Sequence, residues 1–217
     1  MSTRSNIYLK LKNESKGQTI KFDFRKLPRL HGEQHAQLEF PIKDVTIPEN
    51  AEYLCVYHHW DGYITGVGNT LQNTYTDYDT ILNLLAMGDL STINGGVTSY
   101  QGWRNENCPV RFVDKDTKFS HWVGYKTPKT KKVKDAFGTH EEKVYGHYVK
   151  RPMIKKDGTL NSKNALLEEY AYLFDGEKWW VTYFTYDEKK EKYVHHDWVE
   201  LAPILEKEMK AEERVNA

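Results

Sequence analysis

The stretch "YLCVYHHWDGYITGVGNTL", residues Tyr53–Leu71, decides how the chain is interpreted. It begins with a continuous apolar run over Tyr53–Tyr57, which is typical of a central β-strand. Two histidines, a tryptophan and an aspartate follow, and "GVG" at Gly66–Gly68 comes next. Apolar residues then recur every four positions from Val67 to Tyr75, as on one face of a helix. The segment therefore predicts a strand, a sharp corner and a helix.

Further strands are predicted on both sides of this segment, from alternating apolar residues or short apolar runs. They are Asn6–Asn13, Thr19–Leu27, Gln37–Ile42, Val110–Val113, Trp122–Tyr125, Val144–Met153, Glu169–Phe174, Lys178–Tyr186 and Tyr193–Leu201. The first of them alternates and is expected to be half-buried. The turn residues "ESKGQ" predict that it forms a hairpin with the second. The turn "DGE" predicts another hairpin, which joins Glu169–Phe174 to Lys178–Tyr186.

Two more helical segments are expected. Thr76 and Asp79 form a capping box for a helix over residues 81–85, and Gly88 suits its end. Pro203 suits the first position of a helix.

The fold class that follows is α+β. We expect a mostly antiparallel sheet with a short helical pair after a central strand and a C-terminal helix that runs to about Arg214. No linker or repeat divides the chain, so residues 1–217 are expected to form one domain.

Composition excludes several classes of protein. The 217 residues include 31 Lys and Arg against 31 Asp and Glu, and 13% are aromatic, which is not a disordered composition. A balanced chain has no overall field that draws it onto a polyanion, so nucleic-acid binding is not expected. No apolar run approaches the roughly 18 residues of a membrane span, and no export signal is visible, so no membrane contact is expected. Cys55 lies within an apolar run and is predicted to be a buried, inert thiol.

The corner "HHWD" offers the first candidate for chemistry. Successive residues of a strand point to opposite faces, so His58 and His59 are not expected to face the same point. His59 with Asp61 would supply a general base and the carboxylate that orients it, if the protein is an enzyme. The alternative is a structural corner in which Trp60 lies in the core and one histidine is an ordinary polar residue.

A metal site is a weaker alternative. "HHDW" near the C-terminus repeats the composition of the corner, so His58, His59, His195 and His196 would be the ligands if the two pairs converged. The chain has neither an HExxH nor a CxxC motif. No metal and no cofactor is therefore expected.

A ligand site is expected where the glycines precede the helix. Free backbone amides at a helix N-terminus attract phosphate or carboxylate groups, so Gly66 and Gly68 are candidates to bind an anion. Aromatic and polar side chains near them would add stacking and specificity. The full predicted ligand-binding set is Trp60, Asp61, Tyr63, Gly66, Gly68, Trp103 and Arg104. The alternative is that the two glycines permit tight packing at the corner.

The middle of the chain is rich in lysine. Five lysines lie within Lys126–Lys134, a density that is typical of a solvated loop or hairpin tip. As a functional patch, the run would contact phosphates or an acidic protein.

Several motifs together resemble a family of small proteins from bacteriophages and bacterial mobile elements. They are "HWDGY" (His59–Tyr63), "GVG" (Gly66–Gly68), Leu71, Tyr75, "GDLS" (Gly88–Ser91) and the aromatic hairpin "EYAYLFDGEKWWV" (Glu169–Val181). The chain departs from the family in a lysine-rich insertion over about residues 126–164. It has "WRNEN" (Trp103–Asn107) where many members have an Asp-Arg-Gly-Glu-like stretch. The resemblance implies a phage-like origin and a fold, but no reaction.

These patterns lead to a phage-encoded accessory protein in the bacterial host cytoplasm. We expect a non-catalytic binder of a nucleotide-like anion or a host protein, which interferes with a host process such as a defence system. One alternative is a nucleotide or phosphoester hydrolase that uses His59 and Asp61. The other is a pure protein–protein inhibitor that would be sensitive to charge reversal at Lys129, Lys131 and Lys132.

Overall fold

The computed structural model describes residues 3–28, 36–37, 44–94, 96–100, 110–166 and 169–216. The strands are β1 (Ser5–Lys10), β2 (Thr19–Ile20), β3 (Ala36–Gln37), β4 (Val45–Thr46), β5 (Tyr53–His58), β6 (Leu90–Thr92), β7 (Val97–Ser99), β8 (Arg111–Val113), β9 (Lys118–Asp135), β10 (Gly138–Pro152), β11 (Tyr170–Phe174), β12 (Trp179–Asp187) and β13 (Lys192–Glu200). The helical segments are η1 (Asn13–Ser15), η2 (Phe24–Lys26), η3 (Ile64–Gly68), α1 (Asn69–Thr74), α2 (Tyr78–Leu85), α3 (Ser162–Ala165) and α4 (Leu201–Asn216). This is the predicted α+β class, with mostly antiparallel pairing, a short helical pair and a C-terminal helix.

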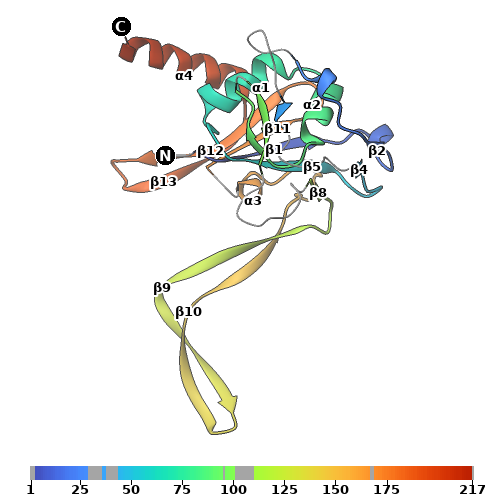
Figure 1. The fold of residues 1–217 in the computed structure, drawn as a ribbon. Helices are drawn as coiled ribbons and strands as arrows, with labels where there is room; N and C mark the ends of the chain where they lie inside the picture. The colour runs from blue at the N-terminus through green and yellow to red at the C-terminus, as the bar shows by residue number, and fades with distance from the viewer. Residues whose placement is uncertain are drawn as a thin grey trace.

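One nine-stranded sheet forms the body of the molecule (Figure 1). Its order is β13-β12-β11-β1-β5-β6-β7-β3, and β8 also pairs with β5. The central strand β5 is antiparallel to β1 and to β8 and parallel to β6. The predicted central role of the apolar run is therefore confirmed, as is the antiparallel β11–β12 hairpin.

The sheet is covered on both faces. Helices α1, α2 and α4 lie on one side of it and α3 on the other (Figure 1). On the helix side, Ile7 of β1 and Leu54 of β5 pack with Leu71 of α1 in the larger core. On the opposite side, Tyr8 packs with the segment that contains α3 in a second core.

The predicted half-buried β1 in a hairpin with the next strand is wrong on both points. Ser5–Leu9 is buried throughout, because both faces of the sheet are covered. β1 pairs in parallel with β11 instead, while the two-residue β2 pairs with β4. After β2 the chain forms the 3₁₀ turn η2, in which the Asp23 side chain accepts a hydrogen bond from the amide of Arg25. Alternation over Thr19–Leu27 thus reflects a partly exposed segment and not one strand.

Two helix boundaries also differ from the sequence prediction. The N-cap of α2 is Asp77, whose carboxylate accepts a hydrogen bond from the Thr80 amide at 2.9 Å, so the capping residue is not Thr76. α4 begins at Leu201, which places Pro203 in the third helical position. Proline is tolerated there, because the first four amides of a helix have no partner within the helix. Of the predicted strand Gln37–Ile42, residues 38–42 lie outside the described part of the chain.

The lysine-rich segment is an ordered ribbon. β9 and β10 form a two-stranded sheet of their own, which projects from the body and changes direction partway along (Figure 1). The pairing register shifts between Val144 and Gly146, as in a β-bulge, which bends a ribbon. We call residues Lys118–Pro152 the arm. The run Lys126–Lys134 therefore lies in a hairpin, one of the two forms expected for it, and the arm begins before the predicted boundary of the insertion at residue 126.

None of the helices in the described ranges combines the length and apolar character that crossing a membrane requires.

Candidate functional site

The corner after β5 is built tightly against the N-terminal segment. Asp61 has a left-handed backbone with φ 58°, a conformation that Asp adopts more readily than most residues. The Gly62 amide donates to the Thr3 carbonyl at 2.9 Å. A Cβ at position 62 would lie 2.7 Å from the carbonyl carbon of Arg4, so only glycine fits. Asp61 and Gly62 are therefore required for the chain to reverse direction at this point, whether or not they bind a ligand.

The two histidines of the corner point to opposite faces, as predicted. His58 alternates with Leu54 and Val56 and is fully buried on the helix side. Neither of its ring nitrogens has a hydrogen-bond partner among the residues that the structure describes. Burial lowers the pKa of His58 to about 3, with a smaller contribution from the neighbouring His59. His58 is thus a neutral core residue.

His59 belongs to an aromatic cluster on the other face. Its Nδ1 lies 2.8 Å from the Tyr57 hydroxyl, and its ring stacks on Tyr100 with centroids 4.4 Å apart. The Trp60 ring meets it edge-on at 4.6 Å. Trp60 is 47% exposed and Tyr63 is 40% exposed, so both present aromatic surface to solvent. The structure therefore brings His59 and Trp60 together. The alternative prediction that Trp60 lies in the core is wrong, because its side chain is partly exposed.

The proposed base and its orienting carboxylate are not hydrogen bonded to each other. His59 Nδ1 is used by Tyr57, and the Asp61 side chain makes no hydrogen bond or ion pair with any described residue. Burial, helped by Arg4, lowers the pKa of His59. The arrangement lacks the contact by which a carboxylate holds a catalytic imidazole.

The amides of the glycine segment are already occupied. Gly66 and Gly68 both donate to the Tyr63 carbonyl, at 3.1 and 3.3 Å, and Val67 donates to that of Asp61 at 2.9 Å. A Cβ at position 66 would lie 2.5 Å from the Asp61 carbonyl oxygen. The geometry therefore supports the packing alternative for these glycines, because an anion would have to displace bonds within the corner.

Gly68 also permits close approach by β11 and α4. A Cβ there would lie 3.2 Å from the Tyr172 ring and 3.3 Å from Leu201. The Tyr172 hydroxyl donates to the Gly62 carbonyl at 2.8 Å, which ties the corner to the sheet.

An ion pair between Asp89 and Arg111 stabilises the C-terminal end of β5. Asp89 accepts the Tyr57 amide at 2.7 Å and the Arg111 guanidinium at 2.8 Å. Burial raises the pKa of Asp89, and Arg111 offsets part of that effect. The "GDLS" motif is thus a brace between β5, β6 and β8, and Asp89 is not a helix N-cap.

The histidine pairs do not converge. His58 ends β5 and His59 follows it, while His195 and His196 lie on β13, four strand positions away, or about 19 Å at the usual strand spacing. His196 stacks on Tyr183 at 4.5 Å, and His195 Nε2 lies 3.0 Å from the Thr182 hydroxyl. Among the described residues, no group of three His, Cys, Asp or Glu side chains could hold a metal ion.

Other predictions lie partly outside the described residues. Trp103, Arg104 and Cys108 fall in the range 101–109. Cys55 is described and buried, and burial raises its pKa to about 11, in agreement with an inert thiol.

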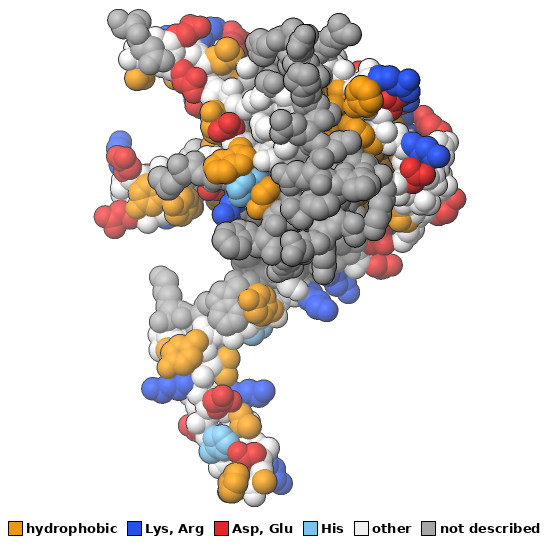
Figure 2. Space-filling model, in the orientation of Figure 1, with side chains coloured by type: hydrophobic (Ala, Val, Ile, Leu, Met, Phe, Trp, Pro, Cys, Tyr) orange, Lys and Arg blue, Asp and Glu red, His pale blue; other side chains and the backbone are white. Residues whose placement is uncertain are grey.

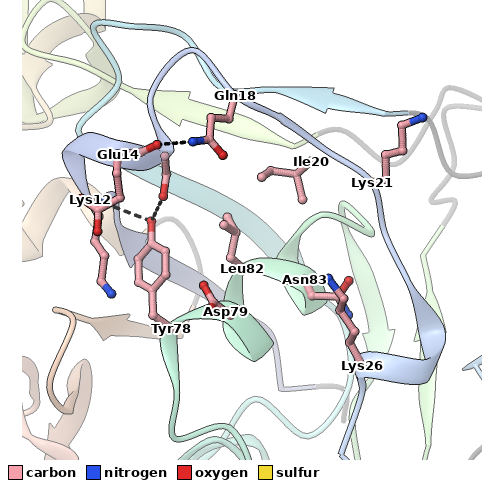
Figure 3. Close-up of a pocket in the computed structure, with 11 residues that line it drawn as sticks. Lys12, Glu14, Gln18, Ile20, Lys21, Lys26, Tyr78, Asp79, Leu82 and Asn83 are labelled. Carbon is pink, nitrogen blue, oxygen red and sulfur yellow. Dashed lines mark hydrogen bonds between the residues drawn. The ribbon is translucent and has the colours of Figure 1, made fainter.

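A cavity of about 400 Å³ lies between α2 and the segment of residues 12–26, at a place that no sequence motif indicated (Figure 3). The polar side chains of α2 that line the cavity form hydrogen bonds with the backbone of this segment. The Tyr78 hydroxyl accepts the Lys12 amide at 3.1 Å, and the Asn83 side chain bonds both the amide and the carbonyl of Asp23. Lys12, Lys21 and Lys26 also line the cavity, but Lys12 Nζ lies 4.4 Å from the centroid of the Tyr78 ring and Lys21 Nζ lies 3.6 Å from Asp44 Oδ2 (Figure 3).

The arm carries three strongly exposed aromatic residues, among them the most exposed one of the described chain, Phe137. Phe137 at its tip is 99% exposed, Tyr148 is 70% exposed and Tyr145 is 66% exposed. Basic side chains lie among hydrophobic ones along its length (Figure 2). The sequence indicated the lysines, but the aromatic residues beside them were not recognised as part of one surface.

Comparisons with protein-family models, with curated proteins and with solved structures found no match for this chain.

Proposed function

We propose that this chain is a binding protein that engages a host macromolecule through the arm. The observation behind this proposal is the exposed tip, where Phe137 is 99% exposed at the end of a ribbon that forms no part of the main sheet. Large apolar side chains that remain in water without a packing role typically mark an interaction site. Two long exposed strands with no such role would be a liability for aggregation.

The phage or mobile-element origin, the host cytoplasm and interference with a defence system complete the proposal. They rest on the resemblance of the "HWDGY", "GVG" and "GDLS" motifs. The hydrolase alternative gains no support, because His59 pairs with Tyr57 and not with Asp61.

Photocrosslinking in living bacteria tests the proposal. Phe137 is replaced by a photoreactive phenylalanine analogue, and the matched control carries the same analogue at Tyr193, which is 73% exposed on the body. We expect a crosslinked host macromolecule from position 137 and none from position 193. The absence of any crosslink from position 137, or equal crosslinking at both positions, would contradict the proposal.

A second candidate function is binding of a small anion at the cavity. Its support is a space of about 400 Å³, a volume that suits a small ligand, with Lys26 among the residues that line it. Calorimetric titration with ATP, and separately with inorganic phosphate, tests it. We expect Lys26→Ala to weaken ATP binding, and no heat from either probe at millimolar concentration would exclude these ligands.

A further inference from the structure

We propose that the macromolecule bound by the arm is duplex DNA, held mainly through its phosphates with the ribbon in the major groove. This inference rests on the function proposed above and names the partner of the same surface. The zero net charge of the whole chain led to the expectation that the protein does not bind nucleic acid. The fold changes this expectation, because it places an excess of basic residues on the arm and an excess of acidic residues on the rest of the chain.

The arm is strongly basic although the chain is neutral. Residues 118–152 contain nine Lys and Arg against three Asp and Glu, a net charge of +6. The whole chain has a net charge of zero, so the remaining residues carry −6. A basic element that projects from an acidic body can reach a polyanion while the body stays at a distance.

The lysines lie on both faces of the outer half of the arm. In the pairing register, Lys134 lies opposite Thr139 and Lys143 opposite Thr130, on one face. Lys129 and Lys131 alternate with these positions and so point to the other face. Alternate residues of a strand are about 6.6–6.8 Å apart, so each face carries a row of charge. A partner that covered one face only would leave the other row unused, whereas a groove has a phosphate backbone on each side.

Two ammonium groups on the outer half of the arm are available for phosphates. Lys134 and Lys143 make no ion pair with any described residue. Glu141 and Glu142 lie opposite Lys132 and Lys131 in the register, but no ion pair forms there within 4.0 Å.

The residue types favour phosphate over an acidic protein. Eight of the nine basic residues in the arm are lysine. Lysine is depleted in protein–protein interfaces, where arginine and aromatic residues are enriched, but it binds phosphate well as a point charge. The major groove of B-form DNA, about 12 Å wide, admits a two-stranded β-ribbon. The major groove of an RNA duplex is deep and narrow, so DNA is the better fit.

The tip adds an apolar contact. Phe137 occupies the two-residue turn between Asp135 and Gly138, and its side chain faces solvent. A phenylalanine in the major groove can contact the methyl group of thymine. Lysine–phosphate contacts are independent of sequence, so we expect little preference among duplexes beyond this contact.

Fluorescence anisotropy of the full chain with a labelled 30-base-pair DNA duplex tests the inference. Five contacts, from Lys129, Lys131, Lys132, Lys134 and Lys143, predict a log–log dependence of affinity on salt with a slope of about −4.5. Lys134→Gln with Lys143→Gln removes two of the three lysines on one face, where Lys132 remains, and Lys129→Gln with Lys131→Gln removes both lysines of the other face. Each pair should reduce the slope to about −2.7 and weaken binding about 60-fold at 0.1 M salt. Phe137→Ala should weaken binding with the slope unchanged.

The matched control is Lys189→Gln with Lys192→Gln, two exposed lysines at the β12–β13 turn, which should leave binding unchanged. Circular dichroism confirms the fold of each variant. Absence of DNA binding at 50 mM salt, or an effect of only one face, would overturn the inference. So would equal or tighter binding to poly-L-glutamate or to an RNA duplex, or salt-sensitive self-association through the arm in sedimentation. A protein crosslinked at position 137, without DNA binding, would overturn this inference and leave the proposed function intact.

Discussion

His58 should make the stability of the folded chain fall steeply with acid. Its ring is fully buried with neither nitrogen paired, and burial lowers its pKa to about 3 in the folded state. In the unfolded chain the pKa returns to about 6.5. The unfolded state therefore binds a proton first, so the contribution of this residue is complete above about pH 6.5 and is lost as pH falls toward 3.

The magnitude follows from the difference between the two pKa values. Each pH unit between them costs about 1.4 kcal/mol, so acidification from pH 7 to pH 5 should cost about 2 kcal/mol through His58 alone. The variant His58→Leu cannot take up a proton and should lose that part of the pH dependence. It also removes two unpaired buried nitrogens, each of a kind that costs about 1–3 kcal/mol, so it should be at least as stable at pH 7.

Urea unfolding followed by tryptophan fluorescence at pH 7, 6 and 5 measures the effect. The quantity is the difference in the free energy of unfolding between the wild type and His58→Leu at each pH. The control is His140→Leu, since His140 is exposed on the arm. A difference that stays constant within about 0.5 kcal/mol from pH 7 to pH 5 would falsify the assignment of His58 as a buried neutral histidine.

Three further changes test the corner and the arm. Gly66→Ala places a Cβ 2.5 Å from the Asp61 carbonyl oxygen and should destabilise the chain by about 1–3 kcal/mol in thermal unfolding, while an unchanged melting temperature would refute the packing role. Asp89→Ala leaves the Tyr57 amide and the Arg111 guanidinium without their acceptor and should cost about 1–3 kcal/mol in urea unfolding; a cost below about 0.5 kcal/mol would show that the brace is dispensable. Phe137→Ser should change stability by less than about 0.5 kcal/mol, because the ring is 99% exposed, and a larger loss would mean that the tip packs against the chain.

The elements that sequence patterns predicted well are those with a strong local signal. The apolar run of β5, the spacing from Val67 to Tyr75 and the "DGE" hairpin each lie within about 20 residues, and each forms the expected element. The spacing of apolar residues indicates which faces of a helix or strand are buried, and this spacing can be recognised within a short segment of the chain.

The predictions that failed concern partners far away in the sequence. Nothing in the "NIYLKLKN" stretch indicates that β1 pairs with β11, whose residues lie about 165 positions later. The nearest turn signal suggested a hairpin instead. The arm was predicted only in pieces, as strands at Trp122–Tyr125 and Val144–Met153 with a solvated loop or hairpin tip between them, because a ribbon exposed on both faces shows no continuous alternation of apolar residues.

The candidate site was predicted only in part. His59 and Trp60 come together, but the hydrogen-bond partner of His59 Nδ1 is the Tyr57 hydroxyl, and the amides of Gly66–Gly68 are occupied within the corner. A residue pattern predicts that the chain turns after β5. It does not predict which groups form hydrogen bonds there, because these depend on tertiary contacts such as that of Asp89 with the Tyr57 amide.

The parallel pairing of β1 with β11 has a consequence for synthesis on the ribosome. Ser5 leaves the ribosome long before Tyr170, its partner in the register. At about 5–20 residues per second, that interval is roughly 8–33 seconds. Throughout it, one edge of the buried β1 has no strand beside it, and such an edge is prone to pair with other chains. The newly made chain should therefore depend on chaperones until β11 emerges, and a truncation before residue 170 should aggregate.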